Sequence, residues 1–554
     1  MTDSSFSSER VFPKLKFLVV DDFENFRNSL KAMLRSFGAD KIETAQNGKE
    51  AVYRCTYERF DVVLCDYNMG EGKNGQQVLE ELRHKKLLKH TSVFALVTAE
   101  TSRDIVMSAR EYQPDTYITK PLTRATLEKR LESLLEQQEA LYPVNAALDA
   151  EDLGAAIERC NELLPKQPRF RPWLQRTLAD LYYRSGGYSE AHQVYESALS
   201  GRGSPNWAKL GQGKVLVAEQ KWDEAIAQFE ALIEKNPDYV EAYDWLAKAQ
   251  QEKGQLRRAQ KTLETALKIS PKAIVRQQHL AEVSTKNQDL EAAATAWRNT
   301  VRLSENSVHE APTHHLNLGR CLSDLSEGDS SEEGRKRAGE ALQVLQQMQR
   351  RYREDSRAEL AGTLIAARVH AGQGDIRESR QLMEQARTSI DPDTVDAETG
   401  LELARTLFTL EDTEAAQSLL RTLAGRFEDN PGTIADIESL LDEPVSMGKK
   451  LQARAANREG IAAFEAGDTD KAAEAFGRAL ELVPQHPALN LNLVQILLKA
   501  AGGSPGGVDA GTLQRCTASL NRIAHLPPQH RQYKRYLSLQ KKVAALTASK
   551  KASS

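Results

Sequence analysis

Short apolar runs alternate with amphipathic stretches over residues 15–139 of this 554-residue chain. Between the runs, apolar residues recur every three or four positions, which is the spacing of a helix. We predict strands at 15–20, 41–45, 61–65, 92–98 and 115–119. We predict helices near 24–37, 47–58, 75–88, 102–111 and 123–139. Five strands that alternate with five helices predict an α/β fold, a doubly wound parallel sheet with helices on both faces.

The pattern changes at about residue 140, where strand-like runs disappear and only helical spacing remains. Alanines then recur every 34 residues, as the differences 225−191, 259−225 and 293−259 show. A further alanine holds the same place in the similar stretch 467–484. These alanines are Ala191, Ala225, Ala259, Ala293 and Ala472. A period of this length indicates stacked helix–turn–helix units, because one such unit cannot bury its apolar face alone.

Other residues of the unit recur with the alanines. Large side chains that would fill the space between units are Tyr195, Phe229, Leu263, Trp297 and Phe476. Glycines expected in the turn within a unit are Gly186, Gly254 and Gly467. Prolines expected to stop the second helix are Pro237, Pro271 and Pro484. This unit resembles the tetratricopeptide repeat (TPR) over most of 140–500, which implies an all-α solenoid that binds proteins or peptides.

Polar residues stand where the predicted strands end. Asp21 and Asp22 follow the first strand, Asp66 the third, Thr98 the fourth and Lys120 the fifth. The carboxyl ends of parallel strands line one crevice, so these groups should converge. Three carboxylates repel one another and need a cation, and an oxygen-rich site suits Mg²⁺. A metal, a carboxylate nucleophile and an ammonium are the parts needed to transfer a phosphoryl group onto an aspartate.

Four motifs carry these residues in order: VVDD (19–22), LCDYNM (64–69), VTAE (97–100) and YITKP (117–121). Together they resemble the CheY-like receiver domain of response regulators. The resemblance implies strand order 2-1-3-4-5 and makes Asp66 the phosphoacceptor. It implies that Lys120 pairs with the phosphoryl group and that Thr98 hydrogen-bonds to it. Tyr117 would be the aromatic switch, which turns inward when Thr98 moves.

The resemblance also implies how the chain would hold Mg²⁺. Asp22, Asp66 and the backbone carbonyl of Asn68 would bind the ion directly, and Asp21 would act through a water molecule. The loop NMGEGKNG at 68–75 departs from the family pattern. The family usually has proline where Gly70 stands, and its next glycine comes one residue earlier than Gly75. This departure bears on metal affinity and phosphoryl lifetime, not on the choice of Asp66.

These patterns divide the chain into four parts. We predict a flexible N-terminus at 1–12, a receiver domain at 13–139, a TPR solenoid at 140–527, and a C-terminal capping helix and tail at 528–554. The last receiver helix should end at Pro143. The polar stretch 326–336 and the glycine-rich stretch 502–511 should be loops within the solenoid.

Composition limits the class of protein. A net charge of -4 and an aromatic content of 6% provide neither the basic surface nor the stacking residues of a nucleic-acid binder. Five scattered cysteines suit a reducing compartment. We find no signal peptide and no apolar run of membrane-spanning length, so we expect a cytoplasmic protein without membrane insertion. No second catalytic set appears, so we expect no enzyme beyond Mg²⁺-dependent phosphorylation and dephosphorylation of the receiver itself.

The leading hypothesis is a two-component response regulator. A sensor histidine kinase or a histidine phosphotransfer protein in a phosphorelay would phosphorylate Asp66. The face made by the fourth helix, fifth strand and fifth helix would then change how the TPR solenoid binds its protein partner. Two alternatives stay open: a TPR-anchored modulator or phosphate sink in a sensor-kinase pathway, and a constitutive TPR scaffold. The sequence also leaves open the solenoid's ligand and whether the chain forms a homodimer.

Overall fold

The computed structural model describes residues 12–553 except 100–113, 202, 389, 391–393, 442–446, 485, 503–508, 525 and 527–531. The chain forms two compact units, Met1–Cys321 and Leu322–Ser554. The predicted flexible N-terminus lies, apart from residue 12, outside the described residues. None of the helices in the described part combines the length and apolar character that a membrane crossing requires.

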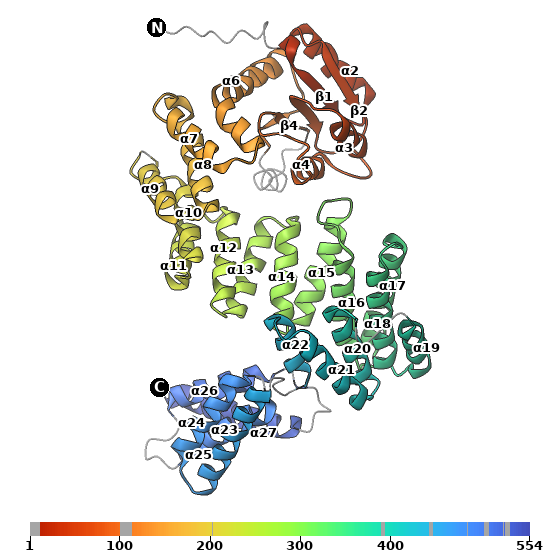
Figure 1. Cartoon of the computed structure of the whole chain (residues 1–554), viewed down its shortest axis with the longest axis vertical. Coiled ribbons are helices and arrows are strands. Elements are labelled where there is room, and N and C mark those ends of the chain that lie inside the picture. The colour runs from red at the N-terminus through yellow and green to blue at the C-terminus, as the bar shows by residue number, and fades with distance from the viewer. Residues whose placement is uncertain are drawn as a thin grey trace. The chain divides into compact units, whose positions relative to one another are not determined.

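The first unit begins with a five-stranded parallel sheet in the order β2-β1-β3-β4-β5 (Figure 1). Its strands are β1 (Lys16–Val20), β2 (Lys41–Ala45), β3 (Val62–Asp66), β4 (Val93–Thr98) and β5 (Thr116–Thr119). Every residue of β3 and β4 is buried, as expected of central strands covered on both faces. The five predicted strands and their predicted order are therefore confirmed.

Helices cover both faces of this sheet. On one face, α2 (Glu24–Ser36) and α6 (Arg124–Asp149) share an apolar cluster with β1, β3 and β4. On the other face, α3 (Gly48–Tyr57) and α4 (Gly75–His84) share a second cluster with the same strands. A 3-10 turn precedes β1. The helix predicted at 102–111 lies outside the described residues, and the doubly wound fold is confirmed by the rest.

Helix α6 is one continuous helix of 26 residues. Both predicted ends, near residue 139 from the apolar pattern and at Pro143 from the proline, are wrong, because Pro143 lies inside α6 and the helix ends at Asp149. An interior proline removes a hydrogen bond and crowds the preceding turn, which costs about 3 kcal/mol. Packing on both sides of the proline offsets that cost. Leu135 packs on the sheet, whereas Leu141 and Val144 pack with the helices that follow.

The residues after α6 fold into consecutive helix pairs. The helices are α7 (Leu153–Leu163), α8 (Arg171–Arg184), α9 (Tyr188–Leu199), α10 (Asn206–Ala218), α11 (Trp222–Lys235), α12 (Val240–Glu252), α13 (Leu256–Ile269), α14 (Ile274–Lys286), α15 (Leu290–Ser304) and α16 (Pro312–Ser326). A 3-10 turn at Pro168–Phe170 precedes α8. The repeat alanines Ala191, Ala225, Ala259 and Ala293 are fully buried, as is Ala472 in the second unit. The all-α repeat architecture predicted after residue 140 is confirmed.

The second unit continues the helical pattern. Its helices are α17 (Glu332–Arg351), α18 (Ser356–Gly372), α19 (Ile376–Arg387), α20 (Ala397–Thr409), α21 (Thr413–Arg426), α22 (Pro431–Leu441), α23 (Met447–Glu465), α24 (Thr469–Leu482), α25 (Pro487–Gly502), α26 (Ala510–Arg522) and α27 (Tyr533–Ser553). The last helix, α27, packs on α25 and α26 through the buried side chains of Tyr536 and Val543.

One predicted loop of this part is partly helical. The polar stretch 326–336 was expected to be a loop, but α17 begins at Glu332. The hydroxyl of Ser331 accepts a hydrogen bond from the backbone N–H of Gly334 at 3.1 Å, which caps the helix. Glu332 and Glu333 then stand in the first turn, where the helix dipole favours negative charge. Of the predicted loop 502–511, residues 503–508 lie outside the described residues.

Candidate functional site

Strand register brings the predicted site residues to one edge of the sheet. Asp66 is the last residue of β3 and pairs with Val97 of β4. Thr98 ends β4 and pairs with Thr119, so Lys120 follows directly beside it. Asp21 follows β1, whose last residue pairs with the residue before Asp66. The convergence predicted from the strand ends is therefore present in the fold.

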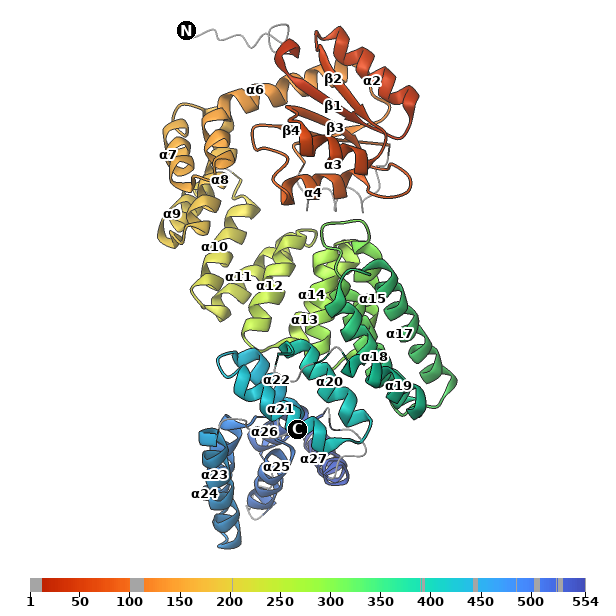
Figure 2. The same ribbon diagram turned by 45° about the vertical axis from the view of Figure 1, so that its right-hand side comes forward.

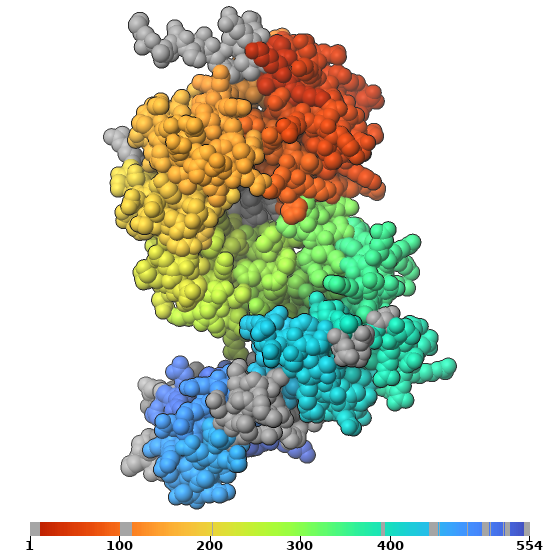
Figure 3. All heavy atoms as spheres, viewed as in Figure 1, coloured from red at the N-terminus to blue at the C-terminus, as the bar shows by residue number. Residues whose placement is uncertain are grey.

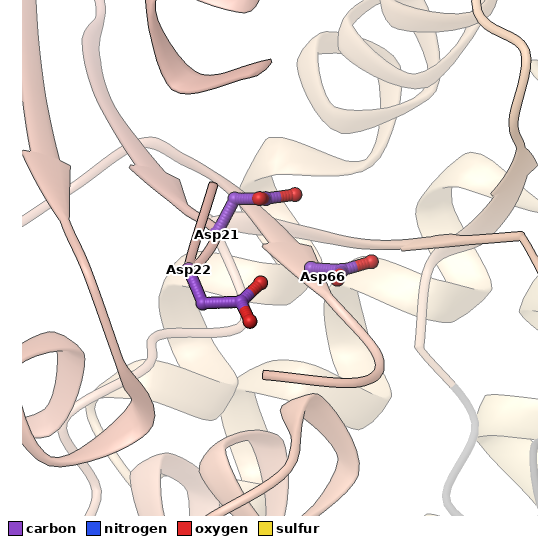
Figure 4. Close-up of side chains that lie close together, drawn as sticks. All are labelled: Asp21, Asp22 and Asp66. Carbon is purple, nitrogen blue, oxygen red and sulfur yellow. The ribbon is translucent and has the colours of Figure 1, made fainter. Parts of the chain in front are cut away.

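Three carboxylates form the core of the site (Figure 4). One ligand atom from each of Asp21, Asp22 and Asp66 can be chosen so that all lie within 4.8 Å of one another. Asp21 is 1% exposed and Asp66 is 6% exposed, whereas Asp22 faces solvent. Two acids of the cluster are thus buried, and the third is open to solvent.

Lys120 lies between the two buried acids. Its Nζ atom is 2.9 Å from Asp21 Oδ2 and 3.1 Å from Asp66 Oδ1. Burial alone would lower the pKa of Lys120, but the hydrogen bonds to the two carboxylates outweigh it and raise that pKa. Burial raises the pKa of Asp66 to about 6, although Lys120 acts to lower it. One ammonium therefore does not fully compensate the buried negative charge.

The sequence prediction missed two residues that support this pocket. The Phe26 ring lies beneath Lys120, whose Nζ is 4.1 Å from the ring centroid in a cation–π contact. Arg27 Nη1 donates a hydrogen bond to the backbone carbonyl of Asp21 at 2.6 Å. Both stand in the first turns of α2, directly after β1. That proximity to the strand end is the signal that could have identified them.

The pocket fits a divalent cation. Carboxylate oxygens are the hard ligands that Mg²⁺ prefers, and a bound cation would favour the ionised form of Asp66, whose pKa is raised mainly by burial. Asn68, whose backbone carbonyl is the further predicted ligand, lies exposed in the loop after β3. The acidic cluster thus provides the ligand chemistry that the sequence predicted.

If Asp66 is a magnesium ligand, as the sequence predicts, magnesium binding should depend on pH, because a carboxyl group binds the ion only when deprotonated. With the pKa of this carboxyl raised to about 6, protons compete with the metal below that value. We expect the apparent Mg²⁺ affinity to be constant above pH 7 and to fall about tenfold per pH unit well below pH 6. Calorimetric titrations from pH 5 to pH 8 measure this. Asp66→Asn should remove the pH dependence, and an equally steep dependence in that variant would contradict the assignment.

The remaining predicted site residues line the same edge. Thr98 is buried at 5% exposure, and its backbone carbonyl accepts a hydrogen bond from the Lys120 N–H at 2.8 Å. Tyr117 of β5 is half-buried beside the cluster shared with α3 and α4, and burial raises its pKa. Glu100 of the VTAE motif lies outside the described residues. The roles of Thr98 and Tyr117 as phosphoryl contact and switch stay predictions.

The loop after Asp66 takes a conformation that explains its departure from the family pattern. Gly70 has a φ of +70°, in the left-handed region. Proline holds φ near −65°, so it does not fit at this position. Gly75, the first residue of α4, lies so close to the end of β3 that an added Cβ would be 2.2 Å from the carbonyl oxygen of Asp66. The start of α4 is therefore in direct contact with the backbone of Asp66.

Gly75→Ala should destabilise the α/β fold, because the added methyl group overlaps the Asp66 backbone. We expect a loss of about 1–3 kcal/mol in the free energy of unfolding, measured by denaturant titration. Gly339→Ala is a matched control, since a Cβ there meets nothing within 4 Å. That exposed helical position should gain up to about 1 kcal/mol. Equal effects of the two substitutions would contradict the close approach at Gly75.

Comparisons with known proteins agree with this geometry. The family described as response regulator receiver domain matches residues 17–132. Chemotaxis protein CheY-3 of Vibrio cholerae serotype O1 is 35% identical over 123 residues, which cover 22% of this chain and 93% of that protein. This chain belongs to the response regulator receiver family. Its receiver is also 33% identical over 123 residues to chemotaxis protein CheY of Pseudomonas aeruginosa, covering 22% of this chain and 98% of that protein.

Two further comparisons concern a solved receiver structure and the repeat region. Among solved structures, CheY4 of Vibrio cholerae aligns with 28% identity and a TM-score of 0.21, covering 22% of this chain and 98% of that one. The tetratricopeptide repeat family matches residues 216–283 and 463–501. The two family matches therefore confirm the predicted combination of an N-terminal receiver with C-terminal TPR repeats.

Proposed function

We propose that this protein is a cytoplasmic two-component response regulator whose receiver is phosphorylated on Asp66 and whose TPR solenoid is the protein-binding output. The observation that carries the proposal is the complete receiver pocket, with three carboxylates within 4.8 Å and Lys120 bridging two of them. The donor would be a sensor histidine kinase or a histidine phosphotransfer protein. The receiver would promote only its own phosphorylation and dephosphorylation.

Each pocket residue has a part in that reaction. An oxygen of Asp66 forms a bond to phosphorus as the bond between phosphorus and the donor histidine breaks. Asp22, Asp66 and the backbone carbonyl of Asn68 would hold Mg²⁺, which would supply positive charge for the transfer. Asp21, buried and paired with Lys120, orients that ammonium toward Asp66. Lys120 then pairs with the phosphoryl group, and Thr98 hydrogen-bonds to one of its oxygens.

Helix α6 supports coupling between this pocket and the repeats. Its first half packs on the sheet and its second half packs with α7 and α8, with no linker between them. The boundary predicted at residues 139–140 falls within this helix and stays a prediction. Movement of α6 against the sheet would therefore reach the first repeat directly. A coupling free energy of about 1–3 kcal/mol would change partner affinity about 5- to 150-fold.

Amide hydrogen exchange on the full chain tests the proposal. Mg²⁺ plus beryllofluoride, which mimics a phosphoryl group, should protect amides around Asp66 and change exchange beyond residue 143. Asp66→Asn is the control and should show neither effect. No protection around Asp66 in the wild type would contradict the phosphoacceptor assignment. Changes confined to the receiver would favour the alternative in which the repeats only anchor a phosphate sink.

A further inference from the structure

The receiver contacts the repeats a second time, far from α6 along the chain. The segment between α15 and α16, here called the 305–310 turn, lies against α4 and the loop before it (Figures 1 and 2). Gln77 Nε2 donates a hydrogen bond to the Glu305 carbonyl at 3.0 Å, and Lys73 Nζ donates one to the Asn306 carbonyl. These partners are 228 and 233 residues apart in sequence, so the contact is a product of the fold.

The 305–310 turn is internally ordered for this contact. Asn306 has a φ of +62°, and its backbone N–H donates to the Glu310 carboxylate at 2.7 Å. The Ser307 hydroxyl donates to the carbonyl of Ser304 at 2.7 Å and accepts from the His309 N–H at 3.1 Å. These bonds aim two backbone carbonyls at the receiver as fixed acceptors. The turn thus has a conformation fixed by its own hydrogen bonds.

One side chain links this turn to the start of α4. Gln77 Oε1 accepts a hydrogen bond from the Asn74 N–H at 3.0 Å, as half of the capping box that begins α4. The Nε2 atom of the same amide donates to the Glu305 carbonyl. Gly75 between them touches the backbone of Asp66. A shift of the loop after Asp66 therefore moves the cap, and the cap carries the contact with the turn.

The loop after Asp66, which departs from the family pattern, takes part in this same contact. The stretch 70–75 is one residue longer than the family pattern, and Lys73 within it reaches both the Asn306 carbonyl and Glu81, whose Oε2 is 2.9 Å away. Gly48 packs closely against Lys73, since a Cβ added at Gly48 would lie 2.7 Å from Lys73 Cβ. The longer loop thus places a cation against the repeats.

A third contact between the turn and the receiver joins His309 to Glu80, a glutamate that is largely buried. His309 Nε2 lies 3.2 Å from Glu80 Oε1, and the side chain of Glu80 is only 10% exposed. Among the described residues, the other Glu80 carboxylate oxygen is buried without a hydrogen-bond partner. A buried unpaired oxygen carries a desolvation penalty, which separation from the turn would relieve. The interface therefore contains one buried carboxylate oxygen whose desolvation is not compensated by a hydrogen bond within the described residues.

The receiver is held at both ends of the intervening repeats. At the near end, Asp149 at the end of α6 accepts hydrogen bonds from the His90 N–H at 2.6 Å and the Thr91 hydroxyl at 2.7 Å. At the far end, the 305–310 turn holds α4. Helices α7–α15 lie between these two contacts along the chain, and Figure 3 shows them in orange to green beside the red receiver. Release of the far contact would leave the receiver attached to the repeats through α6.

We propose that the 305–310 turn is a phosphorylation-controlled latch on the receiver, closed when Asp66 is unmodified and released when it is phosphorylated. This rests on the proposed function, in which Asp66 is the phosphoacceptor. A phosphoryl group adds up to two negative charges beside the N-terminus of α4 and the Lys73 loop. The N-terminus of α4 carries the positive end of the helix dipole, and the loop carries the Lys73 ammonium. The added negative charge draws both toward Asp66 and away from the turn. The repeats 153–304 are then free to take up a partner protein.

Cross-linking on the full chain tests the latch. Gln77→Cys/Glu305→Cys, treated with a short bis-maleimide, should cross-link without activator, and the yield should fall about fivefold or more with Mg²⁺ plus beryllofluoride. Lys86→Cys/Glu151→Cys is the matched control at the near end, where the native side chains form an ion pair. Its yield should not change. The five native cysteines are buried, and the unmodified chain measures their background.

The outcomes separate the latch from the proposed function. An unchanged Gln77→Cys/Glu305→Cys yield, in protein whose Asp66 region is protected by beryllofluoride, would overturn the latch and leave phosphorylation intact. As a second measurement, His309→Ala should tighten beryllofluoride binding about fivefold, because binding and release are reciprocally linked. His192→Ala, an exposed histidine beside Glu196, is its control; equal effects would overturn the latch.

Discussion

Replacing Lys120 by Met is expected to lower the receiver's free energy of unfolding by about 3 kcal/mol in the absence of metal. The substitution leaves Asp21 and Asp66, which are 1% and 6% exposed, without the ammonium that lies 2.9 and 3.1 Å from them. Two buried carboxylates then repel each other without a counter-charge. Hydrogen exchange of the β1 and β3 amides as a function of denaturant measures the loss locally.

The loss at Lys120 should respond to both metal and pH. Saturating Mg²⁺ should restore much of the stability, since the ion replaces the missing positive charge. The defect should be smaller at pH 5 than at pH 8, because protonation of Asp66 removes one of the two charges. Lys214→Met is a matched control, as Lys214 is paired with Glu241 at 2.7 Å but both partners are partly exposed. It should lose less than about 1 kcal/mol. Equal losses for both variants would contradict this account.

The second large effect is expected in the second unit, at a buried ion pair. Arg368 of α18 is 5% exposed and Glu402 of α20 is 0% exposed, with Arg368 Nε 3.2 Å from Glu402 Oε1. Arg368 also pairs with Asp324. Burial alone would lower the pKa of Arg368, but these two carboxylates outweigh it and raise that pKa. Arg368→Met should therefore destabilise this unit by about 3–5 kcal/mol, since it leaves Glu402 charged and buried.

A double substitution distinguishes charge from packing at this pair. Arg368→Met/Glu402→Leu should recover most of the loss, because it also removes the buried carboxylate that has lost Arg368 and keeps the longer contact with Arg405, at 3.8 Å. Denaturant titration followed by helical signal measures both variants. Arg478→Met is the control, because its pair with Glu459 at 2.7 Å is about half exposed and contributes less than about 1 kcal/mol. A double variant no more stable than Arg368→Met would contradict the argument.

Sequence patterns were sufficient for the receiver pocket because strand ends in a parallel sheet meet by geometry. Asp21, Asp66 and Lys120 could be placed together without coordinates, since each directly ends or follows a buried strand. The 34-residue step placed the repeat alanines for a similar reason. The step could not have revealed the buried ion pair, because the N-caps Asp375 and Asp412 of these two units are 37 residues apart, so Arg368 and Glu402 do not hold equivalent positions.

Other features were not accessible from local patterns. Pro143 is a helix-stopping signal by its own chemistry, and only tertiary packing of Leu135, Leu141 and Val144 overrides it. The contact of Gln77 with the 305–310 turn depends on the summed geometry of every helix between α6 and α16. The sequence around Gln77 contains no pattern that predicts this contact. The unusual length of the 68–75 loop was visible, but the surface that it meets was not.

The uninterrupted α6 has a consequence for how such proteins can diversify. Each residue in a helix adds about 100° of rotation and about 1.5 Å of length. A single residue inserted between the halves of α6 would turn the receiver by about 100° relative to the first repeat and move α4 off the 305–310 turn. An insertion of about seven residues would nearly restore the rotational phase. A different receiver could therefore replace this one on the same repeats only if the length of its last helix preserves the rotation that places α4 against the 305–310 turn.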